Sequence, residues 1–277
     1  MKGSASKMKN TPWQGAMSGY CGNVHAGKNL DEMIANLNEH ALKVKQIVSP
    51  EEPMGIGLWL SANSARDVVA ENRLTELKDF LDESGLVPFT FNGFPYGDFH
   101  APVVKHEVYK PDWLTVERLD YTIELAKILS QLTPEGGSAS ISTLPLGWPS
   151  GTRFDWQYEL AAEQFLKLAE SLRILEDQTG RHISVAVEPE PGCVLDTADD
   201  VIMFFEEYLF AEGDEDTVRR YLGVCHDICH SAVMFEPQRE TIEAYSQTGI
   251  KILKVHVSSA IEVDFGALAE DDKPVAL

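Results

Sequence analysis

The chain of 277 residues contains no run of about 18 apolar residues, the length that a membrane-spanning helix requires. Its N-terminal stretch, MKGSASKMKNTPWQG, leads into no apolar segment and is not typical of a secretory signal. The four cysteines are scattered, which argues against a disulfide scaffold and favours a reducing compartment. We therefore expect a cytoplasmic protein without membrane insertion, and a flexible leader at residues 1–17.

Positive charge is also scarce, with 23 Lys and Arg against 44 Asp and Glu and a net charge of −21. A surface this acidic repels phosphate backbones, so we expect no nucleic-acid partner. The sequence has no glycine-rich phosphate loop, and no nucleophile elbow surrounds Asp227, His256 or Ser258. These absences disfavour nucleotide cofactors and serine hydrolases and leave a small-molecule metabolite as the expected partner.

The chain does show a regular alternation of two hydrophobic patterns. Short apolar segments predict strands at residues 19–25, 55–61, 87–92, 138–143, 183–188, 222–227 and 252–258. Helical patterns lie between them, at residues 30–47, 64–84, 115–132, 156–178, 197–209 and 237–247. This alternation predicts an α/β fold, a (β/α)8 TIM barrel formed by one domain at residues 18–277.

The last unit of this barrel is missing from the pattern. Residues 259–277 contain no convincing eighth strand and helix, so we expect an incomplete barrel of about seven β/α units. Three explanations stay open: the polypeptide is truncated, the barrel is left open, or another chain completes it. The last of these predicts a homo-oligomer or a protein partner.

Polar residues gather at the carboxyl ends of the predicted strands. Alternate residues of a strand share one face, and the polar faces are Cys21, Asn23 and His25; Thr90 and Asn92; Ser184 and Glu188; Cys225 and Asp227; Lys254, His256 and Ser258. Barrel active sites are built at this end, by the loops that follow the strands. The long connections at residues 94–112 and 143–155 are typical of binding loops, and their His100 and Trp148 could close over a substrate.

The segment GVCHDICHSAV, residues 223–233, concentrates metal-binding residue types. Its Cys-x3-Cys spacing fits neither zinc ribbons nor thioredoxin-like motifs, so Cys225 is expected to be a small packed thiol. Because successive residues of a strand face opposite sides, His226 is expected to point outward. Asp227 and His230 could instead reach a cation held by Glu188, with His256 completing the set. Carboxylates mixed with imidazoles suit Mn²⁺, Zn²⁺ or Mg²⁺. The structural alternative is an ion pair between Glu188 and Lys254.

These motifs carry a family resemblance. The runs VAVEPEPG, GVCHDICHSAV and LKVHVSSA resemble the xylose-isomerase-like TIM-barrel superfamily of sugar isomerases, epimerases and endonuclease-IV-type enzymes. YCGNVHAG, IGLWLSANSARDV, FTFNGFPYGDFH, VYKPDW and SISTLPLGW are similar to its ebo-cluster metabolite-traffic branch, EboE, over about residues 18–259. The resemblance implies that Glu188, Asp227, His230 and His256 hold the metal, while the superfamily's strand-eight carboxylate has no counterpart here.

Three functions remain open. The first is a metal-dependent isomerase- or epimerase-like enzyme for a small polyhydroxylated or phosphorylated metabolite, in which Glu188, His256 and Lys254 are catalytic. In this hypothesis Asn23, His25 and Asn92 orient substrate hydroxyls, and the resemblance links the protein to making or moving a secondary-metabolite precursor. The alternatives are a non-catalytic metabolite-binding or complex subunit and an endonuclease-IV-like phosphodiesterase.

Overall fold

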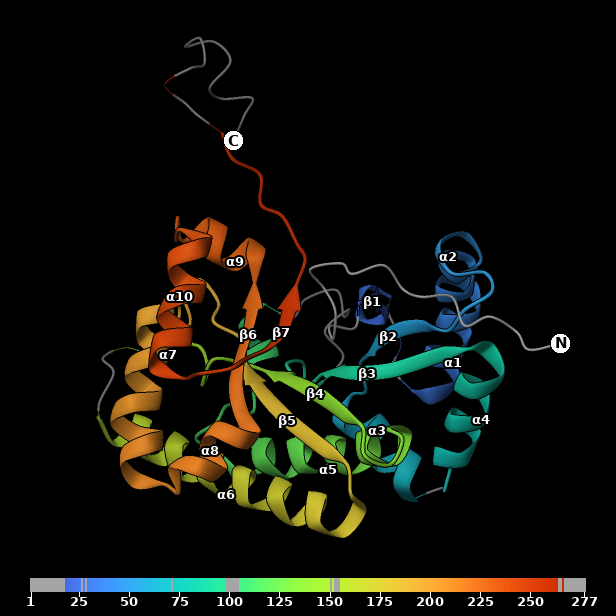
Figure 1. Ribbon diagram of the computed structural model, residues 1–277, viewed down its shortest axis with the longest axis horizontal. Helices are drawn as coiled ribbons and strands as arrows, with labels where there is room; N and C mark the ends of the chain where they lie inside the picture. The colour runs from blue at the N-terminus through green and yellow to red at the C-terminus, as the bar shows by residue number, and fades with distance from the viewer. Residues whose placement is uncertain are drawn as a thin grey trace, which may run out of the picture.

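Seven parallel strands form one sheet in the computed structural model, which describes residues 18–25, 27, 29–70, 72–97, 105–149, 151, 155–263 and 266. The strands follow chain order: β1 (Gly19–Cys21), β2 (Met54–Leu58), β3 (Leu86–Asn92), β4 (Ser138–Thr143), β5 (His182–Val187), β6 (Leu222–Asp227) and β7 (Ile252–His256). Figure 1 shows the sheet curling with helices around it. The fold is a half-barrel that matches the predicted incomplete (β/α)8 barrel.

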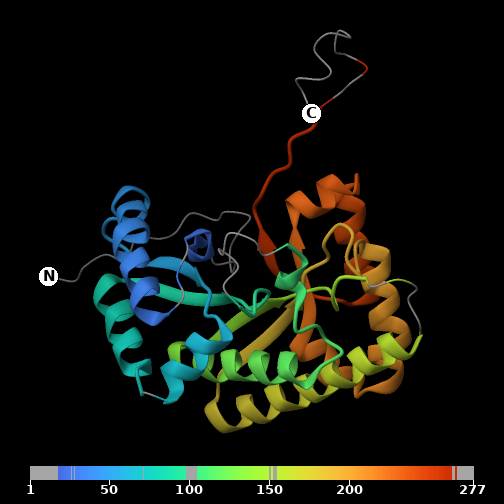
Figure 2. The same ribbon diagram turned by 180° about the vertical axis from the view of Figure 1, so that it is seen from behind.

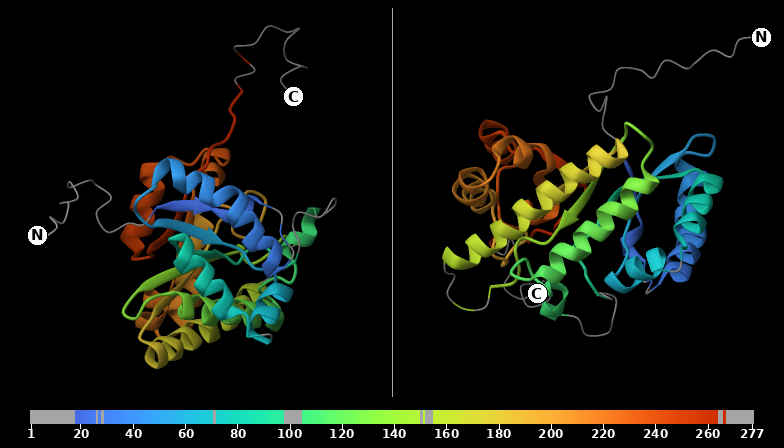
Figure 3. Two further views of the ribbon diagram at one scale, coloured as in Figure 1. Left: turned by 90° about the vertical axis from the view of Figure 1, so that its right-hand side faces the viewer. Right: turned by 90° about the horizontal axis from the view of Figure 1, so that it is seen from below.

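Helices occupy the connections between the strands. They are α1 (Leu30–Asn36), α2 (Leu42–Val48), α3 (Ala62–Ala70), α4 (Leu74–Ser84), α5 (Val116–Leu132), α6 (Asp155–Thr179), α7 (Ala198–Phe204), α8 (Glu215–Tyr221), α9 (Ile228–Val233) and α10 (Gln238–Thr248). Short 3-10 turns occur at η1 (Gly22–Val24) and η3 (Lys105–Tyr109), and π-helical turns at η2 (Leu37–Ala41) and η4 (Phe205–Phe210). Helices α5 and α6 lie side by side under the sheet (Figure 3).

The two faces of each strand differ sharply in chemistry. The outward residues Phe91, Ile141, Val185 and Val224 are fully buried in the apolar core beneath the helices. Burying one such side chain stabilises the fold by about 1.5 to 3 kcal/mol. The alternate residues, which face the inside of the curl, are mostly small and polar. The outer layer therefore holds the fold together, while the inner face is available for a site.

The first strand is shorter than the sequence predicts. β1 ends at Cys21, where the prediction continued to residue 25, and η1 follows it. Gly22 and Asn23 are turn-forming residues, and the His25 amide donates to the Gly22 carbonyl at 3.3 Å, which closes the turn. The prediction that Asn23 and His25 share an inward strand face with Cys21 is therefore wrong.

The predicted helix at residues 64–84 is also wrong, because it is two helices. Asn72 takes a left-handed conformation with φ of 53°, which an α-helix cannot contain, and α3 and α4 lie on either side of it. Helices α8 and α9 were not predicted, since six or seven residues are too few to show a helical period.

In the part of the chain that the structure describes, no helix combines the length and apolarity needed to cross a membrane. The cysteines at positions 21, 193, 225 and 229 are all free thiols.

Candidate metal centre

Four side chains meet where β5, β6 and β7 end. Glu188 directly follows β5, Asp227 ends β6, His256 ends β7 and His230 belongs to α9. His256 Nδ1 lies 3.2 Å from Glu188 Oε1 and 3.2 Å from Asp227 Oδ2. His230 Nδ1 lies 3.8 Å from Glu188 Oε1. The structure thus brings together all four residues that the sequence proposes as metal ligands, and their role as ligands stays a prediction.

Asp227 divides its two oxygens between the fold and the site. Oδ1 accepts hydrogen bonds from the amides of Cys229 at 2.7 Å and His230 at 3.1 Å, which makes Asp227 the N-cap of α9. The Ser258 hydroxyl also donates to Oδ1, at 2.6 Å. Oδ2 is left to face His256. The capping bonds therefore fix the direction of the oxygen that points into the cluster.

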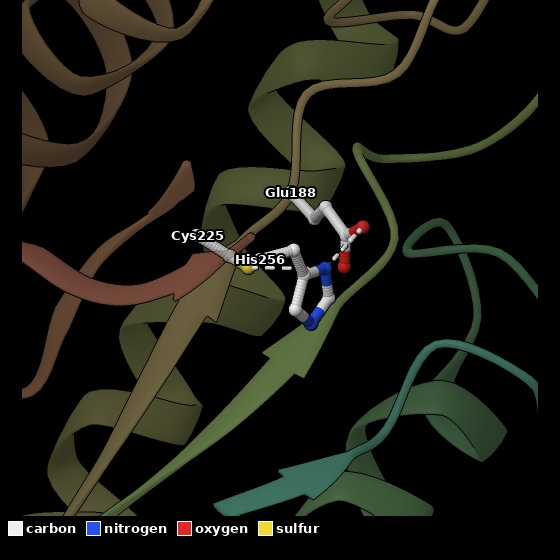
Figure 4. Close-up of side chains that lie close together, drawn as sticks. All are labelled: Glu188, Cys225 and His256. Atoms are coloured by element: carbon white, nitrogen blue, oxygen red, sulfur yellow. Dashed lines mark hydrogen bonds and ion pairs between the residues drawn. The ribbon is translucent and has the colours of Figure 1, made fainter. Parts of the chain in front are cut away.

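His256 carries one positive charge between the two carboxylates. Burial lowers its pKa, but hydrogen bonds with Asp227, Cys225 and Glu188 outweigh burial and raise the pKa to about 12. Burial likewise raises the pKa of Asp227, but the bonds from His256 and Ser258 prevail and lower it below its ordinary value. Figure 4 shows the His256 ring with Nδ1 turned toward Glu188 and Nε2 on the far side. An imidazolium therefore lies between two carboxylates.

The His230 ring is held by the backbone. Its Nδ1 lies 2.9 Å from the Pro189 carbonyl oxygen, a distance at which the nitrogen donates a hydrogen bond. This bond places the proton on Nδ1 and leaves Nε2 as the nitrogen that can bind a cation.

Cys225 lies closer to the cluster than the sequence alone indicated. Its sulfur is 3.9 Å from His256 Nδ1, and its side chain is fully buried. Burial raises the pKa of the thiol to about 11, which agrees with a packed, neutral thiol. His226, in contrast, turns outward and bonds Gln238 on α10 at 2.7 Å, as predicted.

These residues fit a divalent cation. Glu188, Asp227 and His230 each offer a ligand atom, all within 4.8 Å of one another, and Glu188, Cys225 and His256 form a second such group. His256 Nε2 is buried and has no hydrogen-bond partner among the described residues. A cluster that contains two buried carboxylates needs positive charge, and the donor set of oxygens and imidazole nitrogens suits Mn²⁺, Zn²⁺ or Mg²⁺.

Lys254 does not form the alternative ion pair with Glu188. Its Nζ crosses the inner face of the sheet and donates to Ser142 Oγ at 3.0 Å, with the Phe91 carbonyl at 3.4 Å. Asn92 ends β3 on the same face, where its Oδ1 accepts from the Phe94 amide at 3.2 Å and from the Ser142 hydroxyl at 3.4 Å. Lys254 and Asn92 thus belong to one network on the inner face.

The N-terminal candidates lie apart from the four-residue cluster. The Asn23 carbonyl contacts the Cys21 thiol in the turn after β1. His25 Nε2 bonds the Tyr20 hydroxyl at 2.7 Å, and the ring stacks on His40 at 3.9 Å. His25 also lines a separate pocket with residues of α1, β2 and α3. The predicted role of Asn23 and His25 in orienting the same substrate gains no support from these contacts.

Trp148 joins three loops rather than entering the cluster. Its ring lies 4.2 Å from His106 and 5.1 Å from Tyr109, so the predicted binding loops after β3 and β4 meet here. Tyr109 in turn hydrogen-bonds Glu190 and Cys193 in the loop after β5. His100, the other candidate for closing over a substrate, lies outside the described residues.

Sequence reasoning missed the polar inner face of β4. Ser140 donates to Thr90 on β3 at 3.1 Å, and Ser142 bonds both Asn92 and Lys254. The signal was present in the segment SASIST, which has serine at alternate positions.

No protein-family model matches the chain, and no curated protein matches it. Solved structures do match. A D-tagatose 3-epimerase-like protein aligns over 86% of this chain and 74% of its own, with 15% identity and a TM-score of 0.54. A xylose isomerase-like TIM barrel protein from Mycobacterium smegmatis, in complex with magnesium, aligns over 84% and 72%, with 12% identity and a TM-score of 0.53. The IOLI protein, with a bound zinc atom, aligns over 91% and 77%, with 14% identity and a TM-score of 0.52.

The matches extend to a different chemistry. A family 2 AP endonuclease from Brucella melitensis aligns over 84% of this chain and 83% of its own, with 16% identity and a TM-score of 0.51. Identities this low establish a shared architecture and leave the reaction open. The chain therefore has the fold of the xylose-isomerase-like TIM-barrel proteins.

Proposed function

We propose that the protein is a metal-dependent isomerase- or epimerase-like enzyme that acts on a small polyhydroxylated or phosphorylated metabolite. The observation that carries the proposal is the convergence of Glu188, Asp227, His230 and His256 at the carboxyl ends of three neighbouring strands. Matched structures with magnesium and with zinc support a divalent metal, whose identity stays open between Mn²⁺, Zn²⁺ and Mg²⁺.

Each residue of the site has a proposed role. Glu188, Asp227, His230 and His256 would hold the cation, which would supply polarisation of a substrate carbonyl or alkoxide. Asp227 is fixed by its bonds to α9 and Ser258, so its free oxygen stays aimed at the cluster. His256 Nδ1, 3.2 Å from both carboxylates, would either bind the cation or carry a proton for the reaction. Asn92 orients a substrate hydroxyl from β3.

We also propose that the substrate is a precursor of a secondary metabolite. The support is the likeness of the segments YCGNVHAG, FTFNGFPYGDFH and SISTLPLGW to the ebo-cluster metabolite-traffic branch, EboE. A homo-oligomer or a protein partner that completes the barrel stays a prediction.

Two other functions are weaker. An endonuclease-like phosphodiesterase shares the fold, but a net charge of −21 opposes binding to DNA. A non-catalytic metabolite carrier could keep the inner polar face, but it would have no need for two carboxylates and two histidines around one cation position.

Solvent deuterium exchange tests the proposal, because a side chain that takes a proton from a substrate carbon exchanges that proton with solvent. The Mn²⁺-loaded protein is incubated in D2O with a panel of aldoses, ketoses and their phosphates, and NMR follows the loss of carbon-bound protons. We expect exchange with at least one sugar and a loss of about 100-fold or more in Glu188→Gln.

Glu163→Gln is the matched control, because Glu163 is an exposed carboxylate on α6 whose only ion-pair partner among the described residues is Lys167, at 2.7 Å. It should exchange like the wild type. Exchange that survives in Glu188→Gln would contradict the proposed catalytic site. Hydrolysis of a phosphodiester without exchange would favour the endonuclease-like alternative.

A further inference from the structure

The inner face of the sheet carries a lysine that forms no ion pair with a carboxylate of the described residues. Lys254 lies two residues before His256 on β7 and is half-buried. Its ammonium has three N–H donors, and the two bonds it makes go to the neutral oxygens of Ser142 and Phe91.

The nearby carboxylates balance Lys254 only while no metal is bound, because Glu188 and Asp227 carry two negative charges and His256 carries one positive charge. Glu188 and Asp227 are both held by His256, at 3.2 Å each. A bound divalent cation would neutralise the same two carboxylates, so Lys254 would remain in excess by one positive charge. An ammonium partly removed from water without an anion is costly, and an anionic group of a ligand would remove that cost.

The surroundings of Lys254 fit an anion attached to a hydroxylated molecule. Thr90, Ser140, Ser142 and Ser184 line the same face and are all buried. TIM-barrel interiors are ordinarily filled by Val, Ile and Leu, so a row of hydroxyls beside an ammonium is unusual for packing alone. The third N–H of Lys254 and the Thr90 hydroxyl, which accepts from Ser140 and donates in none of the hydrogen bonds of the described residues, can donate to a carboxylate or phosphate.

We propose that Lys254 binds the anionic group of the substrate, which is a polyhydroxylated molecule bearing a carboxylate or a phosphate. This inference rests on the proposed function, because it places the anion on Lys254 and the reacting carbons at Glu188 and Asp227. Alternate residues of a strand are about 7 Å apart, so a short chain of carbons spans from Lys254 to the level of His256.

Calorimetric titration tests this inference with inorganic phosphate, D-gluconate and the uncharged D-glucitol as probes. The full chain is titrated in the presence of Mg²⁺, because Lys254 carries the excess charge when the metal is bound, and comparison with Lys254→Met separates binding at Lys254 from binding at the metal. Wild type is expected to bind phosphate or gluconate, and Lys254→Met to bind them about 10-fold more weakly or worse. Lys254→Arg should restore binding, because it keeps the charge. D-glucitol affinity should not change between these proteins.

Lys251→Met is the matched control, since Lys251 is exposed immediately before β7 and should leave anion binding unchanged. Circular dichroism checks folding, and Lys254→Gln replaces Lys254→Met if the latter unfolds. Equal anion affinity in wild type and both neutral variants would overturn the inference, as would failure of the wild type to bind either anion. Binding of gluconate alone or phosphate alone supports it and selects the carboxylate or the phosphate as the substrate group.

The two proposals fail separately. Anion binding that depends on Lys254 in a protein that never binds a divalent metal would leave the anion site standing and contradict the proposed function. Metal-dependent exchange that persists unchanged in Lys254→Met would leave the proposed function standing and contradict the anion site.

Discussion

At the scale of single residues, the centre depends on which face of its strand each histidine occupies. His226 and His256 both lie at strand ends, but His226 bonds Gln238 on α10 while His256 lies between Glu188 and Asp227. The inward direction follows from the alternation of a strand and could be predicted from sequence. The approach of the Cys225 sulfur to within 3.9 Å of His256 Nδ1 could not, because it depends on which atoms the fold brings close.

The two histidines make a matched pair for mutation. We expect His256→Gln to lower Mn²⁺ affinity about 10-fold or more, because a nitrogen ligand and its bonds to two carboxylates are lost. His226→Gln should bind Mn²⁺ like the wild type. Isothermal titration of each purified variant with Mn²⁺ measures the difference. Equal losses in both variants would mean that the effect comes from the fold and not from the ligand.

At the scale of elements, an ion-pair network ties α6 to β5 and α8. Glu176 on α6 accepts hydrogen bonds from His182 at 2.9 Å, from Tyr221 at 2.7 Å and from Arg220. Burial raises the pKa of Glu176, but these three bonds outweigh it and lower the pKa to about 2. Long-range contacts of this kind cannot be predicted from local sequence, since Glu176 and Tyr221 are separated by a strand and two helices.

The lowered pKa predicts a pH dependence of stability. A carboxylate whose pKa falls on folding stabilises the protein above its unfolded pKa of 4.5, and this stability is lost as the pH falls toward 2. After allowance for partial exposure the contribution is about 1 to 2 kcal/mol. Urea unfolding between pH 7 and pH 3 should therefore show a smaller loss of stability in Glu176→Gln than in wild type.

Glu163→Gln, which removes an exposed helix carboxylate, is the control for this measurement. It should follow the wild-type pH profile. A Glu176→Gln profile that is parallel to that of wild type would show that the network does not couple stability to pH.

The strands could be predicted from sequence far better than the connections. β5, with the sequence HISVAV, is a short apolar run, and β4, with the sequence SASIST, alternates polar and apolar residues, so the bounds of both strands fall within a residue of the prediction. The break at Asn72 gave no comparable signal, because neither glycine nor proline marks it. Helix α9 was missed for a different reason: Asp227 is at once the end of a strand, the cap of a helix and a member of the site.

At the scale of the whole molecule, the strands of the half-barrel are parallel, so their carboxyl ends lie on one side of the fold, which is seen from behind in Figure 2. The fold and the inward faces of Asp227 and His256 followed from the period of the sequence, whereas His230 lies on α9, which that period did not show. The hydrogen bonds from Lys254 to residues of β3 and β4 could not be predicted, because they depend on how tightly the sheet curls. The net charge of the protein helps to distinguish between the functions that proteins of this fold can have, because it determines which charged partners the surface attracts.

The net charge predicts that the protein will not bind DNA. Fluorescence anisotropy with a labelled abasic duplex, at about 50 mM and 200 mM salt with Mn²⁺ present, should show no measurable affinity. Binding that weakens steeply with added salt would revive the endonuclease-like alternative, because that slope reports phosphate contacts.

The most direct test of the central claim is an anomalous diffraction map from crystals grown with Mn²⁺. We predict one strong peak whose distances to ligand atoms of Glu188, Asp227 and at least one of His230 and His256 are about 2.0 to 2.3 Å, as expected for such ligands. A map with no peak between these four residues, or with Mn²⁺ bound only elsewhere, would contradict the account.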